Sequence, residues 1–381
     1  MRVLILGGRA PVALDHARRF AAQGWTTSIA DSAPCRLSAW SNAVASVIRL
    51  PPPRRALADF AAQLSRAISA QRIDLVLPTC EEVFYVSRIR SQLPAGCTVF
   101  AAPFEQLREL HSKWNFLTLA RHCGVKVPDS ARVADLGAAR EWAGSRPVVL
   151  KPEFSRFGVH VRIHPGGIPA AVPPLPPVGP WIVQAYQQGR ELCSYGIACD
   201  GQLTAHIAYE PSYRIPGSSG YFFERRVVPG IERFVAAFVA RIRFTGQISF
   251  DWILGDDGEL SVLECNPRAI SGLHLFAREA PLPAAICDPA TARVSPADCA
   301  PRMFAAVMLA VGLPAAVRAG RLRRWQSDWR RARDVLAVPG DPRPALGACC
   351  DLASYAGRAL REGSPVRAAT THDIEWDGEP L

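Results

Sequence analysis

Short apolar runs alternate with longer amphipathic stretches over the first hundred residues of the chain. Apolar runs of four or five residues predict buried strands, and apolar positions at helical spacing predict the helices between them. The predicted strands are 3–6, 26–30, 44–48, 74–77 and 97–100, and the predicted helices are 13–22 and 54–70. Strands separated by helices of this length indicate a parallel sheet with right-handed crossovers. We therefore expect an α/β, Rossmann-like domain over residues 1–108.

A second pattern begins after residue 108, where β-rich runs dominate. Helices are expected only at 112–123 and 231–243, and residues 164–180 are rich in Pro and Gly, which indicates a connector. The predicted strands are 148–151, 159–163, 181–185, 191–199, 203–209, 247–254 and 260–265. We expect an α+β domain over 109–285 with two lobes, 109–180 and 181–285, and a mainly helical C-terminal extension over 286–381.

The most specific pattern is a predicted hairpin at 244–268, FTGQISFDWILGDDGELSVLECNPR. Its GDDG turn joins two β runs. If Leu254 lies opposite Glu259, then Asp251 lies opposite Val262, because cross-strand partners keep a constant register. Side chains alternate between the faces of a strand, so one face receives two acids and an amide, Asp251, Glu264 and Asn266. The other face receives the apolar residues Phe250, Trp252 and Leu263.

Two carboxylates on one face of a hairpin repel each other unless a cation lies between them. Asp251, Glu264 and Asn266 offer hard oxygen donors without His or Cys, a set that favours Mg²⁺ or Mn²⁺. The alternative is an exposed hairpin with solvated acids. Arg268 follows directly and is suited to neutralise a phosphoryl or acyl-phosphate group. The alternative for Arg268 is an exposed side chain in an Asn-Pro-Arg turn.

Lysine is rare in this sequence, which has only three, Lys113, Lys126 and Lys151, among 44 basic residues. An ammonium group on a flexible stem reaches phosphate oxygens as a point charge. Lys151 ends a β-branched strand, and the loop 153–158 that follows contains Ser155, which could donate to phosphate. That loop has a single glycine, so alone it is a weak phosphate motif. A surface role is the alternative for Lys113, and Lys126 is expected to be exposed.

The net charge of +10 does not by itself indicate nucleic acid, because the arginines are spread along the chain and are not interleaved with aromatic residues. No apolar run approaches the roughly 18 residues that span a bilayer. The eleven cysteines include no CxxC pair, which favours reduced thiols, with Cys265 as a minor candidate nucleophile. We expect a cytoplasmic protein with neither nucleic-acid nor membrane partners. Whether it forms a homo-oligomer is left open at this point.

Residues 181–191, WIVQAYQQGRE, are typical of a strand, a short connection and a second strand. The backbone of such a linker can pair with the edge of adenine, and Glu191 can accept hydrogen bonds from ribose hydroxyls. A purely structural hairpin has a similar sequence. Residues 210–221 are rich in Gly and Ser and are expected to form an open loop, with Tyr213 and Arg214 as candidate contacts to a substrate carboxylate or as ordinary surface residues.

In this order the patterns resemble the ATP-grasp superfamily over residues 1–285, in particular carbamoyl-phosphate synthetase, biotin carboxylase and D-alanine–D-alanine ligase. The resemblance implies a Rossmann-like domain followed by two α+β lobes that hold ATP. It places Lys113 and Lys151 at the phosphates, Glu191 at ribose and Arg268 at the reacting phosphoryl or acyl group. The residues implied at adenine are Gln184, Ala185, Tyr186 and Gln187, and those implied at magnesium are Asp251, Glu264 and Asn266.

The resemblance implies an ADP-forming ligase that activates a small carboxylate as an acyl phosphate for an amine or another nucleophile. Three alternatives stay open: a bicarbonate-using carboxylase or carbamoyl-phosphate synthetase, a non-catalytic ATP-binding module, and a dinucleotide oxidoreductase. The last would use Gly7, Gly8 and Asp31, but GGRAPVA is not GxGxxG and Pro11 occupies the turn, so a structural turn is favoured. The loop 153–158 is bulkier than the usual glycine-rich loop, and no biotinyl-lysine motif is present.

Overall fold

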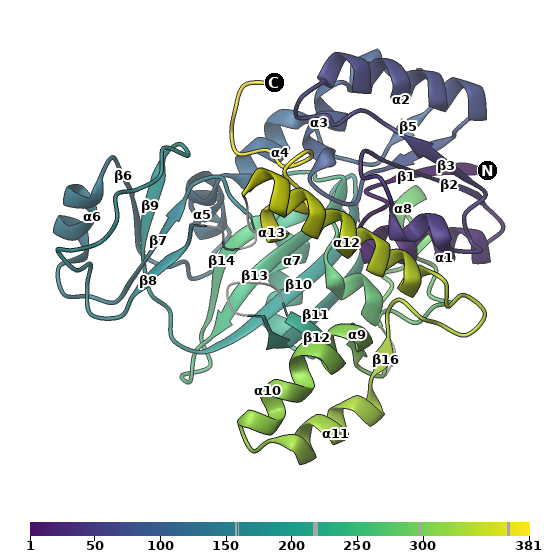
Figure 1. Cartoon of the computed structure of the whole chain (residues 1–381). Helices are drawn as coiled ribbons and strands as arrows, with labels where there is room; N and C mark the ends of the chain where they lie inside the picture. The colour runs from purple at the N-terminus through teal and green to yellow at the C-terminus, as the bar shows by residue number, and fades with distance from the viewer. Residues whose placement is uncertain (157, 159, 216–219, 297–298, 364–365) are drawn as a thin grey trace.

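The computed structural model describes residues 1–156, 158, 160–215, 220–296, 299–363 and 366–381. The strands of these residues form three sheets (Figure 1). The strand orders are β3-β2-β1-β4-β5, β6-β9-β7-β8 and β14-β13-β10-β11-β12-β15-β16. This architecture confirms the expected α/β unit followed by an α+β part, while the exact domain boundaries stay a prediction.

The N-terminal sheet is parallel throughout, as its alternation with helices predicted. Its strands are β1 (Arg2–Leu6), β2 (Thr26–Asp31), β3 (Ser46–Arg49), β4 (Leu75–Leu77) and β5 (Thr98–Val99), and its helices are α1 (Pro11–Ala22), α2 (Leu57–Gln71), α3 (Glu82–Arg88) and α4 (Phe104–His111). Every residue from Val3 to Leu6 is buried, because helices cover both faces of the sheet. The apolar run of β1 is therefore continuous.

A small antiparallel sheet forms the lobe at the left of Figure 1. Its elements are α5 (Lys113–His122), β6 (Ser130–Val133), α6 (Leu136–Ala143), β7 (Val148–Pro152), β8 (Arg162–His164) and β9 (Trp181–Ala185). β7 and β9 lie at its centre and match the predictions closely. The strand predicted at 159–163 is observed only from Arg162, and Val159 lies outside the described residues. β6 and α6 were not predicted.

The large sheet carries the predicted hairpin at one edge. Its elements are β10 (Arg190–Cys199), β11 (Gln202–Arg214), β12 (Gly220–Arg226), α7 (Pro229–Arg241), β13 (Gly246–Leu254), β14 (Leu260–Asn266), β15 (Arg302–Met303) and β16 (Arg333–Asp334). The open loop expected at 210–221 is wrong at both ends, because β11 continues to Arg214 and β12 begins at Gly220. Residues 216–219 of that loop lie outside the described residues.

The C-terminal segment is mainly helical, as expected, but it also adds β15 and β16 to the large sheet. Its helices include α9 (Ala305–Val307), α10 (Leu313–Arg318), α11 (Leu322–Arg331), α12 (Pro344–Glu362) and α13 (Val366–Ala369), and α8 (Leu282–Cys287) lies at its start, mostly before residue 286. In Figure 1, α12 crosses the front of the molecule between the N-terminal unit and the large sheet. The last residues then return to the N-terminal unit, where Trp376 packs against Phe84 at a ring distance of 5.1 Å.

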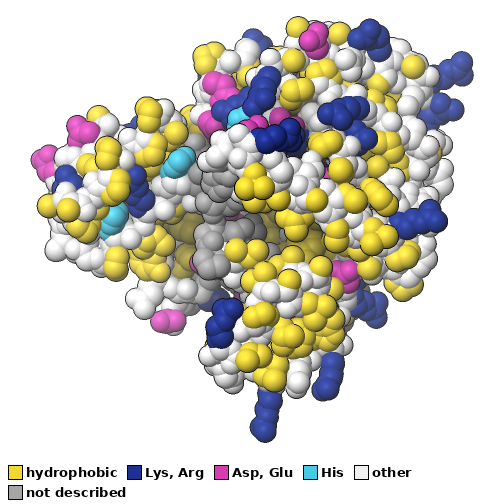
Figure 2. Space-filling view, in the orientation of Figure 1, with side chains coloured by type: hydrophobic (Ala, Val, Ile, Leu, Met, Phe, Trp, Pro, Cys, Tyr) yellow, Lys and Arg dark blue, Asp and Glu magenta, His cyan; other side chains and the backbone are white. Residues whose placement is uncertain are grey.

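Lysine and arginine side chains on the face in Figure 2 are scattered mostly toward its periphery, and hydrophobic side chains are frequent over the C-terminal helices. No helix within the described ranges combines the length and the apolar character needed to cross a bilayer.

Candidate active site

The hairpin β13–β14 brings Asp251 directly opposite Glu264. The predicted register is wrong, because Leu254 pairs with Leu260 and not with Glu259, and a bulge follows Asp251. The turn is one residue longer than predicted: the N–H of Gly255 donates to the carbonyl of Glu259 at 2.9 Å. The longer turn shifts the pairing by one residue, and the bulge shifts it by one more, so Asp251 lies opposite Glu264 and not opposite Val262. The two carboxylates therefore share one face of the hairpin.

The opposite face of the hairpin is apolar, but its composition differs from the prediction. Val262 lies opposite Trp252 and Cys265 lies opposite Phe250, and all four residues are buried. Leu263, which was expected on this face, is the unpaired residue of the bulge and is half-buried.

Asp251, Glu264 and Asn266 form a compact cluster of oxygen donors. The Nδ2 atom of Asn266 lies 3.4 Å from Asp251 Oδ2 and 3.5 Å from Glu264 Oε1, and its Oδ1 accepts from Arg268 Nη2 at 3.3 Å. Burial raises the pKa of Asp251, and the Glu264 carboxylate raises it further. Burial alone would also raise the pKa of Glu264, but Lys113 and then Lys151 lower it. Asp251 and Glu264 are half-buried, and a cation between their carboxylates would relieve the repulsion between them.

A divalent ion at this cluster would have two carboxylates, the Asn266 amide after rotation of its plane, and oxygens from water or phosphate as ligands. Within the described part of the chain no group of three His, Cys, Asp or Glu residues is placed to hold a metal. A site with so few protein ligands suits magnesium, which keeps several waters or substrate phosphates in its shell.

Two of the three lysines lie beside this cluster, and both are almost fully buried, with 4% exposure for Lys113 and 5% for Lys151. Lys113 Nζ is 3.8 Å from Glu264 Oε2 and donates to the carbonyl of Ser155 at 2.9 Å and to its hydroxyl at 3.2 Å. Burial lowers the pKa of Lys151 to about 8 against the opposing effect of Glu264. Lys126 is exposed and lies 3.7 Å from Glu259, as expected of a surface residue.

The loop after β7 is anchored at its first residue, Glu153. Its buried carboxylate accepts from Arg132 at 2.9 and 2.7 Å and from the hydroxyl of Ser112, which also caps α5. Ser155 is held by Lys113, as described above. Phe157 lies outside the described residues.

Arg268 is oriented by a carboxylate that the sequence did not suggest. Its Nε donates to Glu81 Oε1 at 2.7 Å, and the Nε of Arg156 lies 3.9 Å from the same oxygen. Burial would raise the pKa of Glu81, but the two guanidinium groups hold it well below its usual value. Glu81 follows β4 at the carboxyl edge of the parallel sheet, the usual location of functional residues in such folds. This position after a strand of the parallel sheet is the one feature of the sequence that could have identified Glu81 as a site residue.

Residues 184–187, the candidate contacts to adenine, span the end of β9 and the start of the connection to β10 in the large sheet. The N–H groups of Ala185 and Tyr186 donate to the carbonyls of Asp129 and Pro147 at 2.8 and 3.0 Å. The side chain of Gln184 donates to the hydroxyl of Ser130 at 3.1 Å. Among the described residues the N–H of Gln187 has no acceptor, so it is the donor left for a ligand.

The residues expected at ribose and at the substrate carboxylate are engaged with protein groups. Glu191 forms an ion pair with Arg214 on the neighbouring strand. Tyr213 donates its hydroxyl to Asp328 at 2.7 Å and so packs on the C-terminal segment. Cys265 is buried and its pKa is raised well above the usual range, mainly by burial, which makes it a poor nucleophile.

The C-terminal tail supports the same region. Trp376 packs edge-on against Phe154 of the loop after β7, with ring centres 5.3 Å apart, and lies 6.1 Å from the ring of His111. His111 is buried, and its Nε2 has no hydrogen-bond partner among the described residues. Burial lowers its pKa to about 4, so it is neutral near pH 7. The sequence pattern did not predict this contact between the tail and the loop.

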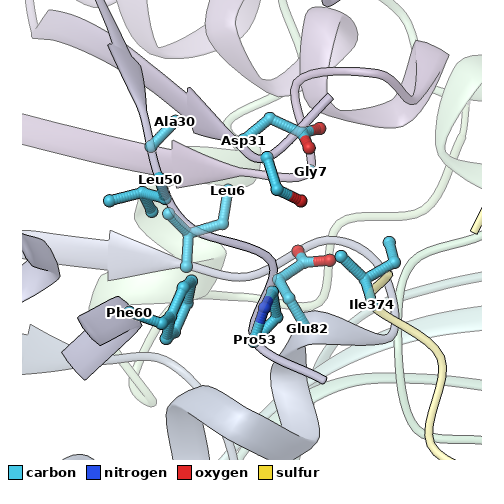
Figure 3. A pocket seen from close by; sticks show the side chains of 10 residues that line it. Leu6, Gly7, Ala30, Asp31, Leu50, Pro53, Phe60, Glu82 and Ile374 are labelled. Atoms are coloured by element: carbon cyan, nitrogen blue, oxygen red, sulfur yellow. The ribbon is translucent and has the colours of Figure 1, made fainter. Parts of the chain in front are cut away.

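Figure 3 shows the cavity at the carboxyl edge of the parallel sheet, where a dinucleotide would be expected to bind. Asp31 and Gly7 line it, but the space open to a water-sized sphere is only about 10 Å³, room for a single water. The carboxylate of Asp31 already accepts from the N–H groups of Arg9 and Ala33, both at 2.8 Å, and from the Arg9 side chain. This favours a structural role for Asp31.

We expect Asp31→Ala to lower the free energy of unfolding by about 3 kcal/mol, because Arg9 loses one of two buried carboxylate partners. The ADP formation that the resemblance implies should be equal in the folded variant and in the wild type. Urea unfolding and an ADP-release assay measure the two effects, with Asp256→Ala in the exposed turn as the control. Binding of NADH by the wild type and its loss in Asp31→Ala, seen by fluorescence titration, would contradict this interpretation.

No family model matches the sequence, and no curated protein sequence matches it. Solved structures do match its fold. N5-carboxyaminoimidazole synthetase from Staphylococcus aureus has a TM-score of 0.60 at 13% identity, covering 79% of this chain and 80% of that one. L-amino acid ligase from Bacillus licheniformis has a TM-score of 0.56 at 13% identity, covering 75% and 74%.

A third structure is the biotin carboxylase domain of Hydrogenobacter thermophilus 2-oxoglutarate carboxylase in complex with MgADP, ADP and bicarbonate. It has a TM-score of 0.60 at 13% identity and covers 78% of this chain and 73% of that one. All three proteins are ATP-grasp enzymes. The order of the sheets, the hairpin at the edge of the large sheet and these likenesses agree, and the chain therefore has the ATP-grasp fold.

Proposed function

We propose that the protein is an ADP-forming ligase that activates a carboxylate with ATP as an acyl phosphate and transfers the acyl group to an amine. The observation that carries the proposal is that a cluster of oxygen donors and a pair of lysines lie side by side. Asp251, Glu264 and Asn266 meet on one hairpin face, and the buried Lys113 and Lys151 lie beside Glu264. A polyphosphate with its magnesium ion needs this combination of cations and hard oxygen donors.

The proposed nucleotide site lies between the two lobes. Lys151, Lys113 and Ser155 would contact the phosphates, and residues 184–187 would contact adenine, with the N–H of Gln187 as a donor. Glu191 would bind ribose after exchanging its ion pair with Arg214. Asp251, Glu264 and Asn266 would hold magnesium, which when bound supplies positive charge beside the β- and γ-phosphates.

In the first step a carboxylate oxygen attacks the γ-phosphorus, the bond to the bridging oxygen breaks, and ADP leaves with the bonding electrons. In the second, an amine nitrogen attacks the acyl carbon, the bond to phosphate breaks, and the amine loses a proton. The chain's part is to hold the reactants in line and to neutralise the charge that spreads over the phosphoryl oxygens. Arg268 is suited to this because its hydrogen bond to Glu81 fixes the guanidinium. Lys151, at the end of β7 in the small sheet, would add a second positive charge.

A release assay over carboxylic acids paired with amines tests this function. We expect ADP formation that needs both MgATP and one class of acid, and a hydroxamate product when hydroxylamine is the acceptor. With an ¹⁸O-labelled acid, one labelled oxygen should appear in the phosphate. Formation of AMP and pyrophosphate, or the absence of any acid-dependent turnover, would refute the proposal. ADP formation that needs only bicarbonate would replace it with a carboxylase-type reaction.

A further inference from the structure

A second hollow lies away from the cluster at Glu264, between α1, the segment after β14, and the C-terminal strands. The space in it open to a water-sized sphere is about 40 Å³, compared with about 10 Å³ in the cavity at Asp31. Five of the side chains that line it are cationic or imidazole groups, Arg18, Arg19, His274, Arg278 and Arg302, and one is an acid, Asp15. A hollow of this size holds more than one water and has room for a small ion.

Two of these arginines are fully occupied by the protein. Arg18 donates to Asp341 at 2.8 Å and to three backbone carbonyls of residues 335–341. Arg19 donates to Asp15 at 2.8 Å and to the carbonyls of residues 273, 276 and 277. Both side chains therefore tie α1 to its neighbours, and neither is available to a ligand.

Arg302 is different, because its guanidinium has neither a hydrogen bond nor an ion pair with any residue that the structure describes. Its Nε is buried without an acceptor. Burial lowers its pKa, and the nearby Arg333 and Arg19 act in the same direction against Asp15. A buried donor without a partner is costly, and native proteins rarely leave one unsatisfied. The Nε–H of Arg302 is therefore free to donate to an acceptor that enters the hollow.

His274 adds a second unsatisfied group to the same hollow. Its ring is 3% exposed, its Nδ1 lies 2.8 Å from Asp15 Oδ2, and its Nε2 is buried without a partner. Asp15 is held anionic by Arg19 and His274, which keep its pKa well below the usual value despite burial. The carboxylate therefore accepts from Nδ1–H, which leaves Nε2 as the ring nitrogen without a protein partner.

The balance of charge around the hollow is positive. The single carboxylate of Asp15 is shared by Arg19 and His274, and Arg18 has its own partner in Asp341. Within the described residues, the side chains of Arg278, which is exposed on the lining, and Arg302 have no acid to pair with. The planar guanidinium fork matches the oxygens of a phosphate or a carboxylate.

We propose that this hollow binds a small oxyanion, the phosphate or carboxylate group of a metabolite, between Arg302 and His274. Arg278 provides further positive charge, and Asp15 orients the imidazole. None of the residues that line the hollow belongs to the proposed nucleotide site, although His274 lies only six positions after Arg268 in the chain. An anion bound here would contact His274, which lies in the short helix Ser271–Leu275 that follows β14 and Arg268.

Calorimetric titration of the full chain tests the site, with inorganic phosphate, glycerol phosphate and succinate as probes at constant ionic strength in potassium chloride. We expect at least one probe to bind with a stoichiometry of one at the hollow, and Arg302→Gln to weaken that binding at least tenfold. Binding of both phosphates without succinate identifies a phosphate group, and binding of succinate alone identifies a carboxylate ligand.

The controls are Arg323→Gln on the exposed face of α11 and Lys151→Met, which removes a phosphate contact of the proposed nucleotide site. Both should bind the probe within about twofold of the wild type.

A stability measurement separates a ligand-binding arginine from a structural one. Without probe, Arg302→Gln should keep or raise the denaturant midpoint of the wild type, because no protein hydrogen bond of the guanidinium is lost. With probe, only the wild type should gain stability. A wild type that binds none of the three probes, unchanged binding in Arg302→Gln, or failure of that variant to fold would each overturn the proposal. Loss of binding in Lys151→Met would assign the probe to the nucleotide site.

Discussion

Glu264→Gln should lose at least about 100-fold of the acid-dependent ADP formation of the wild type. The substitution keeps the size of the side chain but removes one of the two opposed carboxylates that would hold the divalent ion. We expect the remaining turnover to need a higher magnesium concentration, because Asp251 and Asn266 alone form a weaker site. Initial rates over a magnesium titration measure both effects.

The matched control for this variant is Glu259→Gln, an exposed acid of the same hairpin that lies 3.7 Å from Lys126. It removes the same charge from the same element and should turn over like the wild type. Circular dichroism of both variants checks that they are folded. Wild-type rates and an unchanged magnesium requirement in Glu264→Gln would remove the metal assignment.

Lys151→Met should lower turnover at subsaturating ATP by about 100-fold or more, because a buried cation beside the transferred phosphate is lost. Methionine has a similar reach and no charge to desolvate, so the variant should stay folded. Lys126→Met removes an identical group from the surface and serves as the control. Equal turnover in the two lysine variants would exclude a role for Lys151 in phosphate binding.

The pH dependence of nucleotide affinity gives this prediction a second readout. Burial lowers the pKa of Lys151 to about 8, so the free protein loses the ammonium charge as the pH rises above 8. The protonated form binds phosphate, and we therefore expect the Kd of ATP to rise with pH above that value, by at most about tenfold per pH unit. Lys151→Met should bind weakly and without this slope. A wild-type Kd that stays constant from pH 7 to 10 would contradict the assignment.

The local patterns of the sequence were sufficient to predict most of the strands and helices of the fold. Period-two alternation placed Asp251 on the same face as Glu264, and the scarcity of lysine drew attention to Lys113 and Lys151 before any geometry was known. The register of the hairpin was not predictable in the same way. It depends on a five-residue turn and on a bulge at Leu263, and neither feature has a distinctive residue pattern.

Long-range contacts account for what the sequence did not reveal. Glu81 and Arg268 are 187 positions apart, and no local pattern links an acid after β4 to an arginine after β14. The loop expected at 210–221 included the first two residues of β12, and no strand was predicted for the rest, although Tyr221, Phe222 and Phe223 are buried. Here tertiary packing overrides local composition.

The contact between the tail and the N-terminal sheet has a consequence for the order of folding. The guanidinium of Arg9 donates to Asp373, a partner 364 positions away, and the carboxylate is buried with it. Closing so long a stretch of chain is entropically costly, and topologies of high contact order fold slowly. The parallel sheet can therefore form early from its own strands, but the loops at its carboxyl edge lack the contacts of Asp373 until the tail docks in a later step. Before that step the indole-binding surface formed by Phe84, Phe104 and His111 is open to solvent, and at this stage the chain is most exposed to aggregation.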